Sequence, residues 1–226
     1  MREAEAIRLR EILLARGAIS PLLNLGSSNR GFRETDKPHI EAQLFGPLRG
    51  ADVAVVHSDL KHGDGVDVSG DVLDPAVADR LTAMQFRCVL LSNMLEHVAD
   101  RAAVAAACER IVGPGGLILA TVPSSFPYHA DPIDTGYRPS PVELARLFTR
   151  SHPLLAEELA GPTYEEQIAE RNSSICREAA STLLSALAFP LRPKSARSRL
   201  HRWRWLRQPY RVSIVLLEVG KAASAS

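Results

Sequence analysis

Residues 86–123 read FRCVLLSNMLEHVADRAAVAAACERIVGPGGLILATVP, and this stretch decides the fold class. An apolar run ends in the polar pair Ser92–Asn93, and a short turn, an alanine-rich amphipathic segment, the glycine-rich break 113–116 and a second apolar run follow. A buried strand, a helix, a glycine-rich reversal and another buried strand form a βαβ unit of a parallel sheet. Because parallel sheets bind small molecules beyond the carboxyl ends of their strands, the sequence predicts a ligand crevice beside Asn93 and residues 123–128.

The rest of the chain continues this alternation of strands and helices. Apolar segments predict further strands at 21–25, 52–58, 66–68, 154–159 and 210–219, and helical patterns predict helices at 2–16, 75–84 and 141–148. This order predicts an α/β fold with a doubly wound, mostly parallel sheet and helices on both faces. Residues 163–209 interrupt the alternation, and we interpret them as a helical, arginine-rich insertion within a single domain spanning 1–226.

Charge is unevenly distributed along the 226 residues, although the formal net charge is only +1. No acidic residue lies between Glu178 and Glu218, whereas residues 192–211 hold eight of the 27 lysines and arginines, together with Trp203 and Trp205. Arginine beside tryptophan suits an anionic membrane surface, and guanidinium groups also suit nucleic acid, the less favoured partner here. A solvated cap over the acceptor site is the third interpretation.

Cysteine usage and the apolar pattern bear on the expected compartment. Cys88, Cys108 and Cys176 are far apart and form no CxxC pair, which is typical of a reducing compartment. The first residues alternate charge with apolar positions and do not resemble a signal peptide, and no apolar run approaches the ~20 residues that cross a bilayer. We expect a cytoplasmic protein, and the basic segment leaves open a peripheral position at the inner face of the membrane.

The first predicted strand leads directly into a glycine-containing turn, in LLNLGSSNRGF at 22–32. Gly26 lets a ligand approach the backbone, because it has no Cβ. A phosphate-binding P-loop is excluded, since Phe32 and Arg33 stand where lysine and a hydroxyl residue are needed. A dinucleotide fingerprint is excluded because Ser28 replaces its second glycine. An ordinary strand-to-helix turn remains an alternative.

Two segments resemble a known family. SNMLEHV at 92–98, followed by GPGG at 113–116 and an apolar strand, resembles the fourth and fifth motifs of class I S-adenosylmethionine-dependent methyltransferases. HADPIDTGYRPSP at 129–141 is similar to a subgroup of methyltransferases encoded with polysaccharide or lipid-glycan genes. The resemblance covers residues 20–160 and the last strand, and it implies a seven-stranded sheet whose last strand is antiparallel.

The resemblance also implies S-adenosylmethionine as cofactor, held along the strand ends. Residues 24–30 match the family's first motif in degraded form, with an asparagine in place of its acid and Ser28 and Arg30 in place of two glycines. An acid after the second strand can accept hydrogen bonds from both ribose hydroxyls, although a solvated turn residue is the alternative there. An acid after the third strand can accept a bond from the adenine amine. The implied cofactor-binding residues are Asn24, Gly26, Ser27, Asp59, Asp71, Val72 and Asn93.

Glu96 and His97 follow Asn93 by one turn. In the resembling family this segment borders the methionine part of the cofactor. The residues themselves are also explained as the start of a helix, because an acid is stabilised by the positive end of the helix dipole. For His97 we favour a structural role over a catalytic one.

The loop after the fifth strand is dense in polar side chains and prolines. His129 or Asp131 would act as a general base that removes the proton of an acceptor hydroxyl. A metal site at His129-x-Asp131-x-x-Asp134 is an alternative that we do not favour, because no second cluster of ligands accompanies it. A rigid loop held by an Asp134–Arg138 ion pair is the structural interpretation.

Together these observations predict methyl transfer from S-adenosylmethionine to a hydroxyl of a sugar, a glycan or a related small-molecule acceptor. Two alternatives stay open. The degraded first motif is compatible with a non-catalytic binding or scaffold protein of the same fold. The arginine-rich insertion is compatible with an enzyme whose acceptor is RNA or a lipid-linked molecule.

Overall fold

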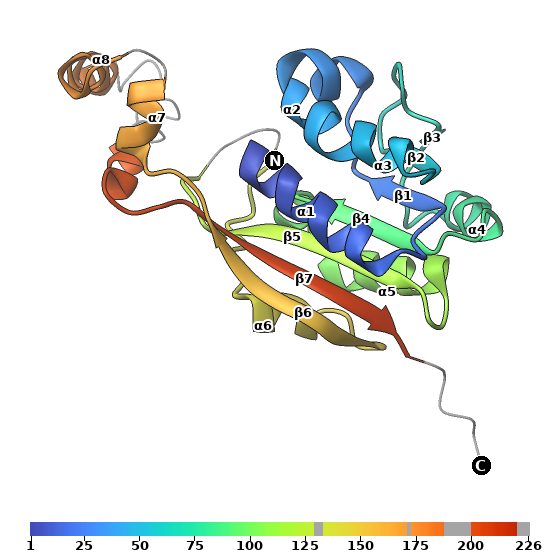
Figure 1. Cartoon of the computed structure of the whole chain (residues 1–226). Helices are drawn as coiled ribbons and strands as arrows, with labels where there is room; N and C mark the ends of the chain where they lie inside the picture. The colour runs from blue at the N-terminus through green and yellow to red at the C-terminus, as the bar shows by residue number, and fades with distance from the viewer. Residues whose placement is uncertain (129–132, 171–172, 188–199, 221–226) are drawn as a thin grey trace.

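The computed structural model describes residues 1–128, 133–170, 173–187 and 200–220. In this part of the chain one seven-stranded sheet has the order β3-β2-β1-β4-β5-β7-β6 (Figure 1). Strands β1 to β5 are parallel, and β7 is antiparallel to both of its neighbours. The sheet is that of the predicted α/β fold, including the antiparallel last strand. The strands are β1 (Leu22–Leu25), β2 (Val55–Asp59), β3 (Val68–Ser69), β4 (Cys88–Ser92), β5 (Leu117–Ser125), β6 (Ser151–Ala160) and β7 (Arg211–Val219).

Burial along the strands follows their place in the sheet. The central strands β1 and β4 are buried at nearly every position, since helices cover both faces of a parallel sheet. The edge strand β6 is half-exposed along its length and carries Glu157 and Glu158. Charged side chains on an edge strand oppose pairing with another chain.

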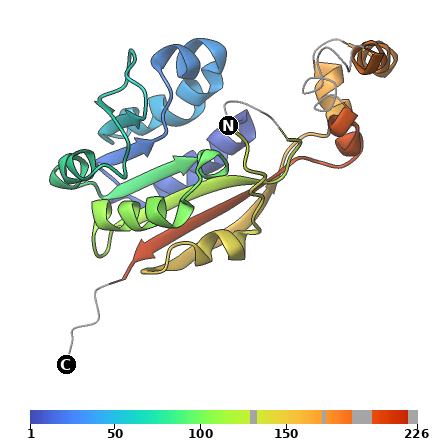
Figure 2. The same ribbon diagram turned by 180° about the vertical axis from the view of Figure 1, so that it is seen from behind.

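Helices pack on both faces of the sheet (Figures 1 and 2). One face is covered by α1 (Glu3–Arg16) and by a chain of short helical segments at 32–50, which includes α2 (Pro38–Ile40) and α3 (Gly46–Gly50). The sequence pattern had not predicted those short segments. The other face is covered by α4 (Pro75–Ala83), α5 (Arg101–Val112) and α6 (Pro141–Arg146). As predicted, α6 starts at the N-cap Ser140, whose hydroxyl accepts a bond from the N–H of Glu143.

Two further helices lie between β6 and β7: α7 (Tyr164–Glu170) and α8 (Ile175–Leu187). They extend beyond the end of the sheet at which β6 ends and β7 begins (Figure 1). Because β7 is antiparallel to β5, this is also the edge that holds the carboxyl ends of β1 to β5. The segment 163–209 is therefore attached beside the predicted crevice. Within the described ranges, no helix is both long enough and apolar enough to span a membrane.

Candidate functional site

The carboxyl ends of β1 and β4 lie side by side at the centre of the sheet. The chain leaves β1 toward β2 on one side, whereas β4 is followed by β5 on the other. Parallel sheets bind ligands at this kind of topological switch point. Gly26, directly after β1, and Asn93, directly after β4, border it.

The turn after β1 makes a close contact with the turn after β4. Gly26 has a φ of 75°, in the left-handed region that favours glycine, and its N–H donates to the carbonyl of Ser58 at 2.8 Å. A Cβ at this position would lie 2.7 Å from Sδ of Met94. Because Gly26 has no Cβ, the flexible and polarisable side chain of Met94 packs directly against its backbone.

Asp59 joins the turns after β1 and β2. Its Oδ2 accepts the N–H of Ser28 at 2.8 Å, and its Oδ1 accepts the N–H of Lys61 at 3.1 Å. The residue is half-buried. Because each carboxylate oxygen has a second lone pair, Asp59 can still accept two hydroxyl groups from a ligand.

Arg33 holds the turn after β1 and the loop after β2 through hydrogen bonds to their backbone. No sequence motif identified this residue. Its guanidinium is buried and donates to the carbonyls of Ser27 at 3.1 Å, Ser28 at 2.6 Å and Gly65 at 2.7 Å. Burial lowers the pKa of Arg33 from its usual value. Ser27 is itself buried beneath the turn. These contacts fix the backbone that would face a ligand.

Asn24 lies inside the sheet, one residue before the end of β1. Its Nδ2 is 3.0 Å from Nδ1 of His57, its register partner on β2. Burial, followed by the charge of Arg33, lowers the pKa of His57 to about 4, so the ring is neutral at pH 7. The amide of asparagine can hydrogen-bond to either tautomer of a neutral imidazole, because it offers both a donor and an acceptor.

Asp71 and Val72 follow β3 and have opposite environments. Asp71 is exposed, and its Oδ1 accepts the N–H of Leu73 at 2.9 Å. Val72 is buried in the core cluster under α4 and α5. The second carboxylate oxygen of Asp71 is thus available at the edge of the sheet.

Helix α1 places a buried carboxylate over the ends of β4 and β5. Oε1 of Glu5 accepts Nδ2 of Asn93 at 2.6 Å and Oγ1 of Thr121 at 2.7 Å. Glu5 is only 2% exposed. No sequence motif identified this residue, because the contact spans more than 80 residues of chain.

Glu96 and His97 form a separate 3-10 turn, η3 (Leu95–His97), and do not begin α5, which starts at Arg101 after the N-cap Asp100. The turn holds the loop that follows β5. The carbonyl of Glu96 accepts Thr135 N–H at 3.0 Å, and Nδ1 of His97 lies 2.6 Å from the carbonyl of Ile133. This geometry gives His97 a role in anchoring that loop.

Two buried polar side-chain atoms have no hydrogen-bond partner among the described residues: Oγ of Ser58 and Oε2 of Glu96. Ser58 pairs in register with Leu25 at the end of β1, and Glu96 follows β4. Both are therefore at the carboxyl edge, on either side of the switch point. Buried polar groups are almost always paired, so orphaned ones point to a polar partner such as a bound ligand.

The chemistry of this edge fits an adenosyl sulfonium compound. Asp59 and Asp71 are acceptors for hydroxyl and amine donors, and Glu5 and Glu96 are carboxylates suited to positive charge. The polar groups offered at this edge are therefore of the kinds that an adenosyl sulfonium compound requires.

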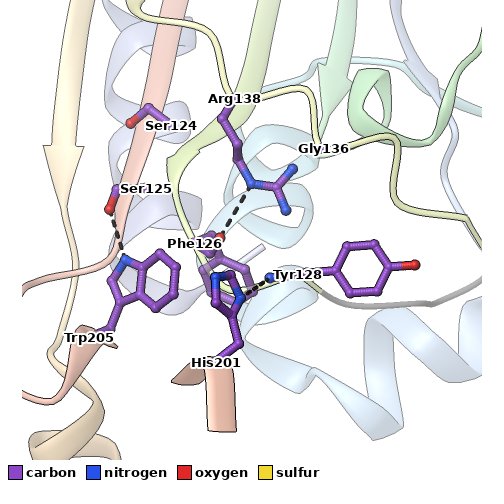
Figure 3. Close-up of a pocket in the computed structure, with 8 residues that line it drawn as sticks. All are labelled: Ser124, Ser125, Phe126, Tyr128, Gly136, Arg138, His201 and Trp205. Atoms are coloured by element: carbon purple, nitrogen blue, oxygen red, sulfur yellow. Dashed lines mark hydrogen bonds between the residues drawn. The ribbon is translucent and has the colours of Figure 1, made fainter. Parts of the chain in front are cut away.

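A cavity of about 300 Å³ opens next to this edge, at the end of β5 (Figure 3). The insertion supplies one wall, in which Nε1 of Trp205 donates to Oγ of Ser125 at 2.8 Å. The N–H of Tyr128 lies 3.3 Å from Nδ1 of His201, whose pKa is lowered by burial. The lining residues are Ser124, Ser125, Phe126, Tyr128, Gly136, Arg138, His201 and Trp205.

The predicted Asp134–Arg138 ion pair is confirmed. Nη2 of Arg138 lies 2.6 Å from Oδ2 of Asp134, and Nη1 lies 3.1 Å from Oδ1. The side chain of Asp134 is fully buried. His129 and Asp131, the predicted general bases, lie outside the described residues, as does most of the alternative metal motif. Within the described ranges no group of three or more His, Cys, Asp or Glu residues is placed to hold a metal ion.

Comparisons with known proteins establish the fold. No protein-family model matches the chain, and no curated protein matches it in sequence. Among solved structures, the [4+2]-cyclase SpnF is 15% identical with a TM-score of 0.57, over 95% of this chain and 81% of that one. Coclaurine N-methyltransferase, bound to N-methylheliamine and SAH, is 13% identical with a TM-score of 0.55, over 96% and 70%. A SAM-dependent methyltransferase from Archaeoglobus fulgidus is 14% identical with a TM-score of 0.50, over 96% and 95%.

The chain therefore has the class I methyltransferase fold. One of these similar structures is a cyclase, so the fold alone does not define the reaction.

Proposed function

We propose that this protein is an S-adenosylmethionine-dependent methyltransferase whose acceptor is a hydroxyl of a sugar, a glycan or a related small molecule. The observation that carries the proposal is the acceptor-rich edge at the switch point, where Ser58 and Glu96 keep buried polar atoms without partners. The aromatic cavity beside it would receive the acceptor.

The cofactor would lie across the ends of β1 to β4. Asp59 would accept the ribose hydroxyls, and Asp71 would accept the adenine amine with Val72 below the ring. Gly26, Ser27 and Asn93 would border the methionine part. Asn24 contributes indirectly, because its contact with His57 holds β1 against β2.

The acceptor would bind in the cavity at the end of β5. Its volume of about 300 Å³ is at the small end of ligand pockets. Phe126, Tyr128 and Trp205 provide aromatic faces against which the apolar face of a sugar ring can pack, and Ser124 provides a hydroxyl.

When bound, the cofactor would supply an electrophilic methyl group on a sulfonium. The chain's own contribution is mainly to hold the acceptor oxygen in line with that group, which is worth about 7–11 kcal/mol in favourable cases. His129 or Asp131 would take the acceptor proton, a contribution of about 10²–10⁴-fold. In the sequence they come one and three residues after Tyr128, which lines the cavity.

Titration calorimetry with S-adenosylmethionine and S-adenosylhomocysteine tests the cofactor assignment. Binding of both ligands is expected, whereas no binding at millimolar ligand would favour the non-catalytic scaffold. A radiolabelled methyl donor, offered with glycan precursors, lipid-linked sugars and RNA in parallel, tests the acceptor. Label in RNA or lipid alone would contradict the small-molecule acceptor.

We also propose a cytoplasmic location with peripheral contact to anionic membrane through 192–211. In the described part of this region, residues 200–211, Arg204 and Arg207 are exposed. Outside it, Leu183 and Leu184 of α8 are 64% and 67% exposed. Cationic and apolar groups together favour an anionic lipid surface. Vesicles containing anionic lipid should co-sediment the protein at low salt and release it at high salt. Failure to pellet at low salt contradicts this proposal.

A further inference from the structure

Two buried carboxylates on separate elements lie near the switch point. Glu5 comes from α1 and Glu96 from η3, and they are 2% and 1% exposed. Glu5 is satisfied by Asn93 and Thr121, whereas Oε2 of Glu96 has no partner in the described structure. A buried carboxylate without a partner is costly in its charged form.

The charged groups around Glu96 do not neutralise it fully. Nε2 of His97 is 3.8 Å from its Oε1, and Arg138, which also acts on it, is held in a forked pair with Asp134. Glu5 acts on it with like charge. Burial is the largest influence and, with the like charge of Glu5, it outweighs the opposing effects of His97 and Arg138, so that the pKa of Glu96 is raised to about 7.

We infer that Glu96, with Glu5 behind it, is the subsite for the positively charged methionine end of the cofactor, and that it distinguishes the sulfonium substrate from the uncharged thioether product. This inference rests on the proposed function. Glu96 would make the protein bind the substrate S-adenosylmethionine more tightly, relative to the product S-adenosylhomocysteine.

The physical reason is that binding of a sulfonium changes the protonation of Glu96. Near neutral pH the free protein holds a proton on Glu96 in a substantial fraction of molecules. A sulfonium beside the carboxylate favours its charged form, so binding releases that proton to solvent. S-adenosylhomocysteine lacks the sulfonium charge, so it should release less of the proton and should gain less from ionised Glu96.

The size of the effect follows from the population of the ionised form. If only ionised Glu96 binds the sulfonium strongly, a group with a pKa of about 7 changes the apparent affinity about tenfold between pH 6 and pH 8. The ratio of the two affinities should therefore move toward S-adenosylmethionine as the pH rises.

Calorimetry at pH 6, 7 and 8, in buffers of different ionisation enthalpy, measures both affinity and proton release. In the wild-type protein we expect the affinity ratio to rise about tenfold over this range, with proton release on binding of S-adenosylmethionine. In Glu96→Gln, the ratio of the affinities for S-adenosylmethionine and S-adenosylhomocysteine should be nearly independent of pH. The proton release should also disappear, apart from titration of the ligands themselves. Glu109→Gln is the matched control, because Glu109 is equally buried but its Oε1 accepts hydrogen bonds from the Arg150 N–H and the Ser151 hydroxyl at another part of the molecule.

A second variant keeps the test decisive if Glu96→Gln does not fold. Glu5→Gln retains an acceptor oxygen for Asn93 but removes the like charge, so the pH at which the ratio changes should fall. If the affinity ratio depends on pH in the same way in the wild type, Glu96→Gln and Glu5→Gln, the inference is overturned. The cofactor assignment would remain intact. If the wild-type protein binds neither ligand, the proposed function fails instead.

Discussion

Nδ2 of Asn93 donates to Oε1 of Glu5 at 2.6 Å, and this bond ties the first helix to the segment beyond β4. The same oxygen of Glu5 accepts Thr121 at the neighbouring strand. Helix α1 is therefore part of the candidate site as well as a cover for the sheet. Any ligand at the switch point would have α1 on one side and the η3 turn on the other.

Gly26→Ala should destabilise the fold and weaken cofactor binding. An alanine at positive φ costs about 1–2 kcal/mol, and the new Cβ would also displace Met94. Gly17→Ala is the matched control, since Gly17 has a φ of 74° and no atom within 4 Å of an added Cβ. Urea unfolding should show a larger loss for Gly26→Ala, and calorimetry should show weaker binding for that variant alone. Equal effects of the two substitutions would contradict a role for Gly26 in the site.

Asp71→Ala should weaken S-adenosylmethionine binding by about 1–3 kcal/mol, because the adenine amine loses its acceptor. The substitution also removes the bond to the N–H of Leu73, so Asp71→Asn, which keeps one oxygen for that bond, separates the two effects. Asp79→Ala, on the exposed surface of α4, is the control for charge. Unchanged affinity in Asp71→Ala would refute the adenine assignment.

Trp205→Phe should raise the KM for the acceptor about two- to tenfold, because the aromatic face is kept but the bond to Ser125 is lost. The affinity for S-adenosylmethionine should not change, since the cavity lies beside the cofactor edge. Trp203→Phe is the control: its indole N–H donates to Thr182 and its ring does not line the cavity. Initial rates with an acceptor from the labelled-donor screen measure the effect. An equal change in both variants would indicate a general loss of packing in the insertion.

Arg138→Ala should destabilise the protein by about 3–5 kcal/mol, because the buried carboxylate of Asp134 loses the guanidinium that neutralises its charge. The exposed pair of Arg211 with Glu158 provides the comparison. Arg211→Ala should cost only about 0–1 kcal/mol, since solvent screens that pair. Equilibrium unfolding in urea measures both, and equal losses would contradict the importance of the buried pair.

Acid should destabilise the fold through His57. Its pKa is about 4 in the folded protein and 6.5 in the unfolded chain, so the unfolded chain binds more protons between these values. The contribution of His57 is complete above pH 6.5 and is lost toward pH 4, at up to about 1.4 kcal/mol per pH unit. His57→Gln should remove this component from urea unfolding curves recorded between pH 4 and 7. A wild-type slope in His57→Gln would show that another group causes the pH dependence, and His152→Gln on the exposed edge strand is the control.

The candidate site was predictable only in part. Gly26, Asp59 and Asn93 were predicted because they lie at or just after predicted strand ends, which gather at one edge of a parallel sheet, and Asp71 was predicted from the family resemblance. Asn24 was grouped with them by its motif position, but its side chain pairs with His57 inside the sheet. Periodicity cannot report which side chain on the next strand a residue will meet.

By itself, the sequence determined the succession of strands and helices along the chain, the antiparallel last strand implied by the family resemblance, and the placement of polar residues at strand ends. Those features depend on local apolar patterns and turn residues, which act over a few positions. Only the tertiary structure decided that Glu5 reaches Asn93, that Arg33 supports the first turn, and that Trp205 closes a cavity against Ser125. The contacts of Glu5 with Asn93 and of Trp205 with Ser125 join segments about 80 residues apart or more. They arise from how the helices and strands pack.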